Sequence, residues 1–188
     1  MSTDKFFYEI PVLSSVANNM YNLASTTPND QWIDYYAFKA IPVPIKYTVD
    51  SWWRRLYDLH PFKAGIIKID ENTYYDWHID TDRGVGLNML LNNWDTSHCL
   101  FNPKIQRGES VEIDNMTDKF IELKYKPNTY YLFNTQMTHS VYNFKDTRYL
   151  LTIDFFEDRT KLNYNQLLEE IKQEKWFEQQ LKKEQNDT

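Results

Sequence analysis

Short stretches rich in β-branched and aromatic residues follow one another through the second half of the chain, and this pattern constrains the fold most strongly. Turn sequences such as Asp70-Glu71-Asn72, Pro127-Asn128 and Lys145-Asp146 separate these stretches. About eight short strands at a spacing of roughly 8–12 residues are typical of a β-sandwich or barrel. The expected strands are Lys63–Asp70, Tyr74–Ile79, Gly86–Asn92, one around Cys99 and Leu100, Phe120–Tyr125, Thr129–Phe133, His139–Phe144 and Arg148–Phe156.

Helices are expected on both sides of this β-rich region. They are predicted over Leu13–Ala24, over Ser51–Leu59 with Asp50 as its cap, and over Lys161–Leu181. A strand is expected at Phe6–Ile10, and an extended piece around Tyr35–Ile41 within an irregular connection. The 188 residues are therefore predicted to form a single, mainly β domain over residues 1–188. We expect a cupin-like jelly roll with N-terminal helices and a C-terminal helix, with its core at about residues 63–157.

Composition limits the partners and the location of the protein. The net charge is −6 and the isoelectric point about 5.2, so nucleic acid is not an expected partner. Cys99 is the single cysteine, which excludes an internal disulfide and a cysteine-based zinc site and fits a reducing compartment. No signal peptide and no apolar run long enough for a membrane span are found, which predicts a cytoplasmic protein without a membrane partner.

Four residues carry the predicted chemistry. His78 and Asp80 leave a strand two positions apart, so their side chains share one face if the strand persists. Taken alone, a His-x-Asp pair arises by chance in roughly a quarter of such sequences. His139 begins a later strand, and Arg148 begins the next one, across a turn. Two imidazoles and one carboxylate form the facial triad of non-haem Fe(II) oxygenases, and an arginine can bind the distal carboxylate of a 2-oxo acid.

The segments around these residues resemble the 2-oxoglutarate/Fe(II)-dependent dioxygenase superfamily. The segments that carry the resemblance are His78-Ile79-Asp80, Gly86–Leu91, Phe133–Val141, and Arg148 followed by Leu150–Phe156. Within the superfamily, the pattern is similar to aspartyl/asparaginyl β-hydroxylase-like proteins. There is one departure: the well-known aspartyl β-hydroxylases carry a small, non-ligating residue where this chain has Asp80. That difference weakens any transfer of their substrate.

The resemblance covers roughly Lys63 to Glu157 and implies a double-stranded β-helix that binds Fe(II), 2-oxoglutarate and O₂. On this pattern His78, Asp80 and His139 are the metal ligands, and Arg148 binds the distal carboxylate. The implied reaction is hydroxylation of an unactivated C–H bond. The substrate would be a protein or peptide side chain, with a free amino acid or small metabolite as the next choice.

Further residues are expected in the pocket. Asn88 follows the family pattern for a group near the oxo-acid, although a strand asparagine can equally satisfy a buried backbone group. Strand parity adds three more candidates for cofactor binding, and proximity to the triad adds two candidates for substrate contact. The first group is Tyr75, Tyr131 and Thr152, and the second is Arg83 and Trp77.

Other interpretations remain open. The same fold and ligands would serve a cupin-like metal enzyme that does not use 2-oxoglutarate, and a noncatalytic jelly-roll binding module would make the metal residues coincidental. Arg148 could instead be a surface residue paired with Asp146 or Glu157. His60 and His98 lack matching partners in the sequence and are expected to be structural or solvated. Cys99 is expected to be a small core residue.

Overall fold

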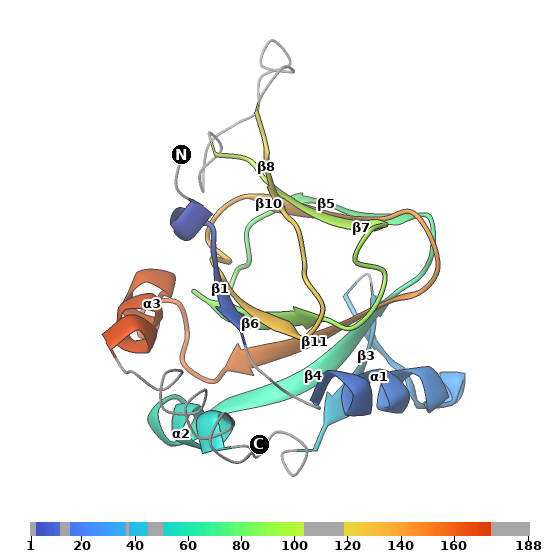
Figure 1. Ribbon diagram of the computed structural model, residues 1–188, viewed down its shortest axis with the longest axis horizontal. Helices are drawn as coiled ribbons and strands as arrows, with labels where there is room; N and C mark the ends of the chain where they lie inside the picture. Colours follow the sequence, from blue (N-terminus) through green and yellow to red (C-terminus); the bar gives the residue numbers. More distant parts are fainter. Residues whose placement is uncertain (1–2, 12–15, 37, 45–50, 104–118, 174–188) are drawn as a thin grey trace, which may run out of the picture.

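Two antiparallel sheets face each other and enclose the interior of the protein (Figure 1). The computed structural model describes residues 3–11, 16–36, 38–44, 51–103 and 119–173. The larger sheet has seven strands in the order β1 (Phe7–Pro11), β9 (Thr129–Phe133), β6 (Gly86–Leu90), β11 (Arg148–Phe155), β4 (Phe62–Ile69), β3 (Phe38–Val43) and β2 (Ile33–Tyr35). The smaller sheet has four, in the order β5 (Thr73–His78), β10 (His139–Asn143), β7 (Ser97–Phe101) and β8 (Ile121–Leu123).

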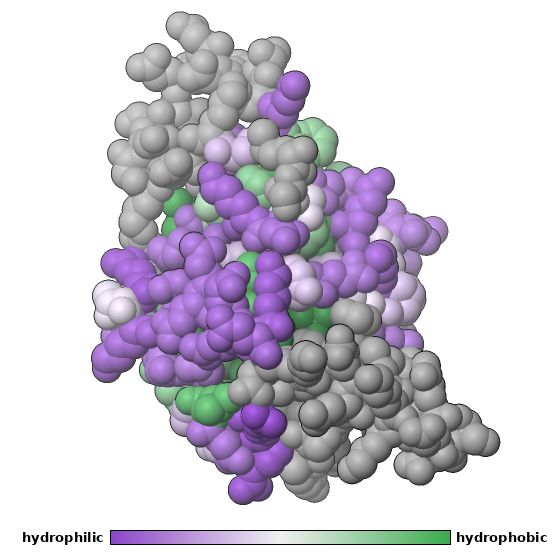
Figure 2. Space-filling view, turned by 60° about the vertical axis from the view of Figure 1, so that its left-hand side comes forward, coloured by the Kyte–Doolittle hydropathy of each residue, from purple (hydrophilic) through white to green (hydrophobic). Residues whose placement is uncertain are grey.

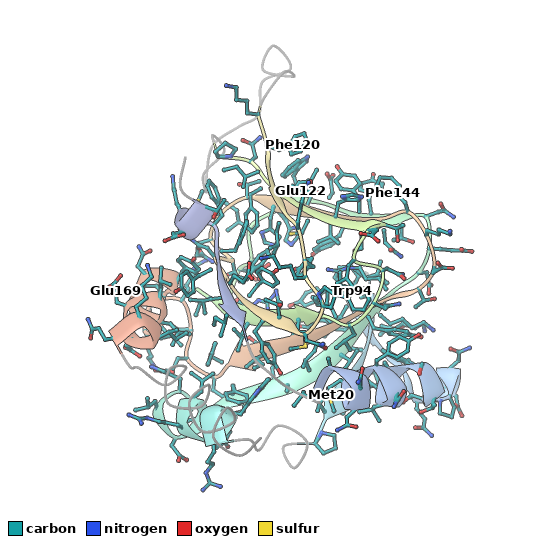
Figure 3. The ribbon with its side chains drawn as sticks, in the orientation of Figure 1. Met20, Trp94, Phe120, Glu122, Phe144 and Glu169 are labelled. Atoms are coloured by element: carbon teal, nitrogen blue, oxygen red, sulfur yellow. The ribbon has the colours of Figure 1, made fainter. Side chains whose placement is uncertain are left out.

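Three helices lie outside the larger sheet: α1 (Val16–Thr26), α2 (Ser51–Leu59) and α3 (Tyr164–Gln173) (Figure 1). Single 3-10 turns, η1 (Thr3–Lys5) and η2 (Asn29–Gln31), complete the described elements. Met20 lies on the side of α1 nearest the sheet, where it is fully buried (Figure 3). On the face seen in Figure 2, hydrophilic residues predominate and apolar ones show mainly between them. None of the helices among the described residues is long and apolar enough to span a membrane.

Strands β4 and β11 are apolar on both faces because each face is covered. The outer face of β4 carries Ile66, which joins a cluster with the helices, and the inner face carries Ile67 and Ile69. β11 pairs with β4 along its whole length, from Arg148 opposite Ile69 to Phe155 opposite Phe62. A strand buried on both sides shows a nearly continuous hydrophobic run, as Leu150–Ile153 does. The central strands of the larger sheet therefore divide a helix-covered layer from the interior between the sheets.

A β-bulge in β5 sets the direction of His78. Tyr75 pairs with Val141 and His78 with His139, so β5 contains one more residue than β10 between these two pairs. The extra residue, within Asp76–Trp77, interrupts the two-residue alternation of the strand. Tyr75 and His78 therefore both face the interior, although simple alternation would place them on opposite faces.

The strand predictions for residues 63–156 are confirmed, with ends that differ by no more than two residues. The predicted helices are also present in the described residues, although α3 begins at Tyr164 and not at Lys161; the expected helical positions 13–15 and 174–181, and the expected cap Asp50, lie outside the described residues. The extended piece expected around Tyr35–Ile41 is present as two paired strands, β2 and β3, so the connection around it is more regular than expected. Together with β1 these strands extend the larger sheet, so its core reaches beyond residues 63–157.

Candidate metal and oxo-acid site

His78, Asp80 and His139 meet at the end of β5 and the start of β10. One potential ligand atom from each residue lies within 4.8 Å of the others. The Oδ1 atom of Asp80 is 3.5 Å from Nε2 of His78 and 3.9 Å from Nε2 of His139. The two imidazole rings come from directly paired residues, and their centroids are 4.2 Å apart. The sequence prediction that these three residues share one site agrees with this geometry.

The histidines are oriented so that their Nε2 atoms face the centre of the site. Nδ1 of His78 lies 2.6 Å from the carbonyl oxygen of Asp76, and Nδ1 of His139 lies 2.9 Å from that of Met137. A carbonyl can only accept, so each Nδ1 carries the proton and each Nε2 lone pair is free to bind a metal. Burial is the main cause that lowers the pKa of His139 to about 4, so its ring is neutral at physiological pH.

Arg83 binds the second oxygen of the Asp80 carboxylate. Its Nε donates to Oδ2 of Asp80 at 2.5 Å, while Oδ1 faces the histidines. Burial by itself would raise the pKa of Asp80, but Arg83 and the two imidazoles outweigh it and the pKa is lowered. Asp80 is thus an ionised carboxylate with one oxygen directed to the metal position and the other bound by a guanidinium.

Side-chain and backbone hydrogen bonds join the loop that carries Asp80 to the loop that leads into His139. The backbone N–H of Asp80 donates to the carbonyl of Thr135 at 3.1 Å. Nε2 of Gln136 donates to the carbonyl oxygens of Asp80 and Arg83 at 3.1 and 2.8 Å. The Thr135 hydroxyl donates to the same Arg83 carbonyl at 2.7 Å. These hydrogen bonds hold the two ligand-carrying loops in a fixed relation to each other.

Arg148 is a buried cation that lacks a carboxylate partner among the described residues. It is 1% exposed and lies on the inner face of β11, and its Nε and Nη2 atoms have no hydrogen-bond partner among the residues that the structure describes. Its guanidinium hydrogen-bonds the side chain of Tyr125 and lies 5.8 Å from the centre of that ring. Burial lowers the pKa of Arg148 because it penalises the charged form. The alternative of a surface arginine paired with Asp146 or Glu157 is wrong.

A cavity of about 690 Å³ connects Arg148 to the triad. Its walls come from both sheets, with Ile67 and Leu150 on the larger sheet and Val141 on the smaller one. All three triad residues and Arg148 line it. A single cavity thus contains a candidate metal site and a cation that lacks an anionic partner among the described residues.

The remaining predicted residues divide into two groups. Asn88, Tyr75 and Arg83 line the cavity, whereas Tyr131, Thr152 and Trp77 do not. The Tyr131 hydroxyl donates to the carbonyl of Lys124 and accepts from the N–H of Lys126.

Thr152 acts on neighbours of the site. Its hydroxyl donates to Asn88 Oδ1 at 2.8 Å and accepts from Arg83 Nη1 at 3.4 Å. Trp77 lies in the bulge of β5 and is partly exposed. A direct role in the pocket for Tyr131, Thr152 or Trp77 is therefore not supported.

Sequence reasoning missed Tyr125 and Gln136. Tyr125 follows β8 and contacts Arg148 from the opposite sheet, and no local motif marks it. Gln136 lies inside the segment that carried the family resemblance, so its position was a usable signal. Cys99 is a buried residue of the inner cluster as expected, and burial raises the pKa of its thiol to about 12. His98 binds Glu122 through Nδ1 at 2.6 Å.

The described residues fit Fe(II) and 2-oxoglutarate. Two imidazoles and one carboxylate on one side of an ion leave positions open for further ligands, as non-haem iron oxygenases require. The unsatisfied donors of Arg148 match a carboxylate, which a guanidinium binds with two parallel hydrogen bonds. The donor set on the triad and the orphaned guanidinium are two separate observations, and both are explained by one metal-bound dicarboxylate.

Solved structures with the same architecture were found, although no protein-family model and no curated protein matches the sequence. A prolyl-4-hydroxylase from Pseudomonas putida aligns at a TM-score of 0.58 and 11% identity, over 79% of this chain and 91% of that one. HygX from Streptomyces hygroscopicus, solved with nickel, 2-oxoglutarate and hygromycin B bound, aligns at 0.56 and 13%, over 80% and 83%. The viral collagen prolyl hydroxylase vCPH from Paramecium bursaria Chlorella virus-1, solved as a 2-oxoglutarate complex, aligns at 0.53 and 11%, over 79% and 93%.

At these identities the likeness concerns the fold. The narrower resemblance to aspartyl/asparaginyl β-hydroxylase-like proteins stays a prediction. The two facing antiparallel sheets, and the three alignments that cover most of each chain, establish that this protein has the double-stranded β-helix fold of the 2-oxoglutarate/Fe(II) oxygenases.

Proposed function

We propose that the protein is an Fe(II)- and 2-oxoglutarate-dependent oxygenase that hydroxylates an unactivated C–H bond of a protein or peptide side chain or of a small metabolite. The observation that carries the proposal is Arg148. A buried guanidinium with unsatisfied donors, in the same cavity as a facial triad, has an obvious anionic counterpart in the distal carboxylate of 2-oxoglutarate. A cupin-like metal enzyme that does not use 2-oxoglutarate would leave this cation unexplained.

Each residue has a defined task in the proposed reaction. His78, Asp80 and His139 would hold the ion through Nε2, Oδ1 and Nε2. Arg83 binds the other oxygen of Asp80, which would leave Oδ1 as the metal ligand. When bound, iron and its cosubstrate supply the oxidising chemistry, and the protein supplies orientation and shielding.

The walls of the cavity serve that shielding. Arg148 would bind one end of the cosubstrate, and the apolar residues Ile67, Leu150 and Val141, which line the same cavity, would limit the access of water to it. Asn88 completes the wall, and its Oδ1 is held by the Thr152 hydroxyl. The cosubstrate would thus be held at both ends in a dry channel that leaves the metal accessible from the open side.

The first test is an anaerobic titration of the purified protein with Fe(II) and 2-oxoglutarate. We expect the visible charge-transfer band of a chelated 2-oxo acid, and in air the release of succinate. His139→Ala and Asp80→Ala should abolish the band, because each removes a metal ligand. His98→Ala is the matched control, since His98 binds Glu122 away from the cavity. Absence of the band in the parent protein would contradict the proposal and favour the noncatalytic binding module.

The Arg148→Gln variant separates the two enzymatic interpretations. We expect it to bind Fe(II) normally and to lose affinity for 2-oxoglutarate by 10-fold or more, since about 1.4 kcal/mol corresponds to a tenfold change. An unchanged affinity for 2-oxoglutarate would favour a cupin-like metal enzyme.

A further inference from the structure

The outer part of the cavity differs in chemistry from the inner part. We call it the vestibule and define it by the aromatic and charged residues that line it beyond the triad. The aromatic members are Tyr35, Tyr36, Phe38, Tyr75 and Phe156. The charged members are Lys63, Asp82, Asp154, Glu157 and Asp158.

Exposure and register establish which end of the cavity is open. Tyr36 is 76% and Phe156 65% exposed, whereas Arg148 is 1% exposed. Arg148 and Asp154 lie at opposite ends of β11, six residues apart and both on its inner face. At about 3.3 Å per residue they are roughly 20 Å apart. A substrate must therefore enter past the vestibule, while the inner end is reserved for the ligand of Arg148.

Large aromatic side chains contact one another in the vestibule, outside the buried core of the protein. Tyr35 and Tyr36 contact each other edge to face at 4.8 Å between ring centroids, and Phe38 contacts Tyr75 in the same way at 4.6 Å. Tyr36 adopts a φ of 52°, a conformation that costs energy for a residue with a side chain. The negatively charged faces of such rings attract cations, most strongly where several rings converge.

The charges of the vestibule favour a cation. Arg83 is bound to Asp80, and Nζ of Lys63 lies 3.1 Å from Oδ2 of Asp154, so the cations that line this part of the cavity already have partners. Neither Asp82 nor Asp158 forms a salt bridge among the described residues, and Lys161 acts on Asp158 only as a minor electrostatic influence.

Two further contacts keep this part of the cavity acidic. The Thr160 hydroxyl and N–H are the main cause that lowers the pKa of Asp158, which keeps its carboxylate ionised. Glu157 shares one imidazole, His60, with Glu170, so that two carboxylates surround a single potential positive charge. Arg159 lies nearby, but it donates to the carbonyl of Thr81 and does not line the cavity.

We propose that the vestibule recognises a protonated amine, so that the substrate of the proposed hydroxylation is a cationic molecule or side chain. The inference rests on the proposed function. Acidic residues alone would not indicate a ligand, but the same cavity contains the unsatisfied guanidinium of Arg148, which points to a ligand-binding space. The vestibule adds carboxylates beside aromatic faces, which is the chemistry that binds ammonium groups.

Binding is tested with four defined probes on the purified protein by isothermal titration and saturation-transfer NMR. The cationic probes are 1,5-diaminopentane and an acetylated lysine tripeptide amide. The comparators are the same tripeptide with norleucine and with glutamate. Each is measured on the metal-free protein and again on the anaerobic complex with Fe(II) and 2-oxoglutarate. Binding of the diamine alone would identify a small amine, and binding of the lysine peptide a protein side chain; either result supports the proposal.

Variants locate the bound amine. The double variant Asp82→Asn with Asp158→Asn should weaken the cationic probes roughly two- to fivefold for each carboxylate removed, the range of exposed ion pairs. Tyr36→Ala should weaken them as well through loss of a ring face. Asp95→Asn, which removes an exposed carboxylate away from the cavity, is the control and should change nothing.

Three results would overturn the proposal: no binding of either cationic probe, equal or tighter binding of the norleucine or glutamate peptide, or unchanged affinity in the double variant. These results are distinct from failure of the proposed function, which the charge-transfer band reports. If amines bind but the charge-transfer band is absent, the amine-binding role of the vestibule is supported and the oxygenase function is contradicted.

Discussion

The residues at this site differ in what they do for the fold and what they do for a ligand. Arg148 is the clearest case, because a buried charge without an anionic partner destabilises the protein that contains it. His78, His139 and Asp80 are better satisfied, since each has hydrogen-bond partners that fix its orientation. A residue that destabilises the fold without a ligand and can bind an anionic ligand is typical of a binding site.

Replacing Arg148 with methionine should separate stability from ligand binding. We expect the free energy of unfolding of the metal-free protein to stay the same or to rise by about 1 kcal/mol or more, because the uncompensated charge is removed. The increase in melting temperature that 2-oxoglutarate gives in the presence of Mn(II) should disappear. Urea and thermal unfolding with and without ligand measure both. A large loss of stability would mean that the guanidinium is needed by the fold itself.

Arg83 should matter for metal binding more than for folding. Arg83→Gln removes the charge that holds Oδ2 of Asp80, and we expect a loss of Zn(II) or Mn(II) affinity on the order of 10- to 100-fold. Arg83→Lys should recover part of this loss, because an ammonium can reach the same oxygen. Competition with a chromogenic chelator measures the affinity, and circular dichroism checks the fold. Equal affinities in all three proteins would contradict a positioning role.

At the level of elements, loops and a bulge decide which side chains reach the interior. The bulge in β5 turns both Tyr75 and His78 inward. The loop after β5 is then fixed on one side by Gln136 and on the other by the segment before α3, where Gly84 forms a bridge with Asn163. Contacts from two distant parts of the chain thus hold the loop that carries Asp80.

Gly84→Ala should disturb this loop. An added Cβ would overlap the carbonyl oxygen of Leu162 and crowd the backbone at Arg159 and Asn163, none of which can move as a side-chain tip can. We expect a destabilisation of about 1–3 kcal/mol and a weaker metal site, measured by urea unfolding and by Mn(II) titration. Gly86→Ala is the control for stability, since its added Cβ would meet only ordinary contacts of 3.4 to 3.7 Å. Equal effects of the two substitutions would argue against close packing at Gly84.

Over the whole molecule, His60 connects parts that are distant in sequence. It follows α2, and its two ring nitrogens lie 2.7 Å from Glu157, just after β11, and 2.7 Å from Glu170 in α3. Burial alone would lower the pKa of His60, but the hydrogen bonds to Glu170 and Glu157 outweigh it and the pKa is raised. The His60 side chain therefore joins the end of α2 to α3 and to the residues that follow β11.

This connection makes stability depend on pH. The folded-state pKa of His60 lies above the unfolded value of 6.5, so its contribution is fully present below pH 6.5 and is lost as the pH rises through the folded-state pKa. The loss is about 1.4 kcal/mol for each unit of pKa difference. Urea unfolding between pH 6 and 9 should show the decline, and His60→Gln should flatten it. The same slope in the variant would assign the effect to another group.

Much of this architecture could be predicted from the sequence, because alternating strands and turn residues are local signals. That His78, Asp80 and His139 lie together and share a cavity with Arg148 was also predictable, from residue types in the right order with a matching resemblance. The pairing of β2 with β3, the bulge in β5 and the contact of Tyr125 with Arg148 were not, since each depends on packing between distant segments. The two-residue alternation of strands suggested Tyr75 as a pocket residue, and Tyr75 lines the cavity because the bulge in β5 turns it inward. The same alternation suggested Tyr131, but its hydroxyl hydrogen-bonds the backbone of Lys124 and Lys126 and does not line the cavity.

The unsatisfied guanidinium at the inner end of the cavity also limits how selective the protein can be. A guanidinium binds a carboxylate group and makes no contact that would distinguish the rest of the molecule. Every dicarboxylate long enough to reach from the triad to Arg148 is therefore a competitor for the same space, including the succinate that the proposed reaction releases. The fraction of protein with 2-oxoglutarate bound would therefore depend on the ratio of 2-oxoglutarate to the competing dicarboxylates, and not on the concentration of 2-oxoglutarate alone.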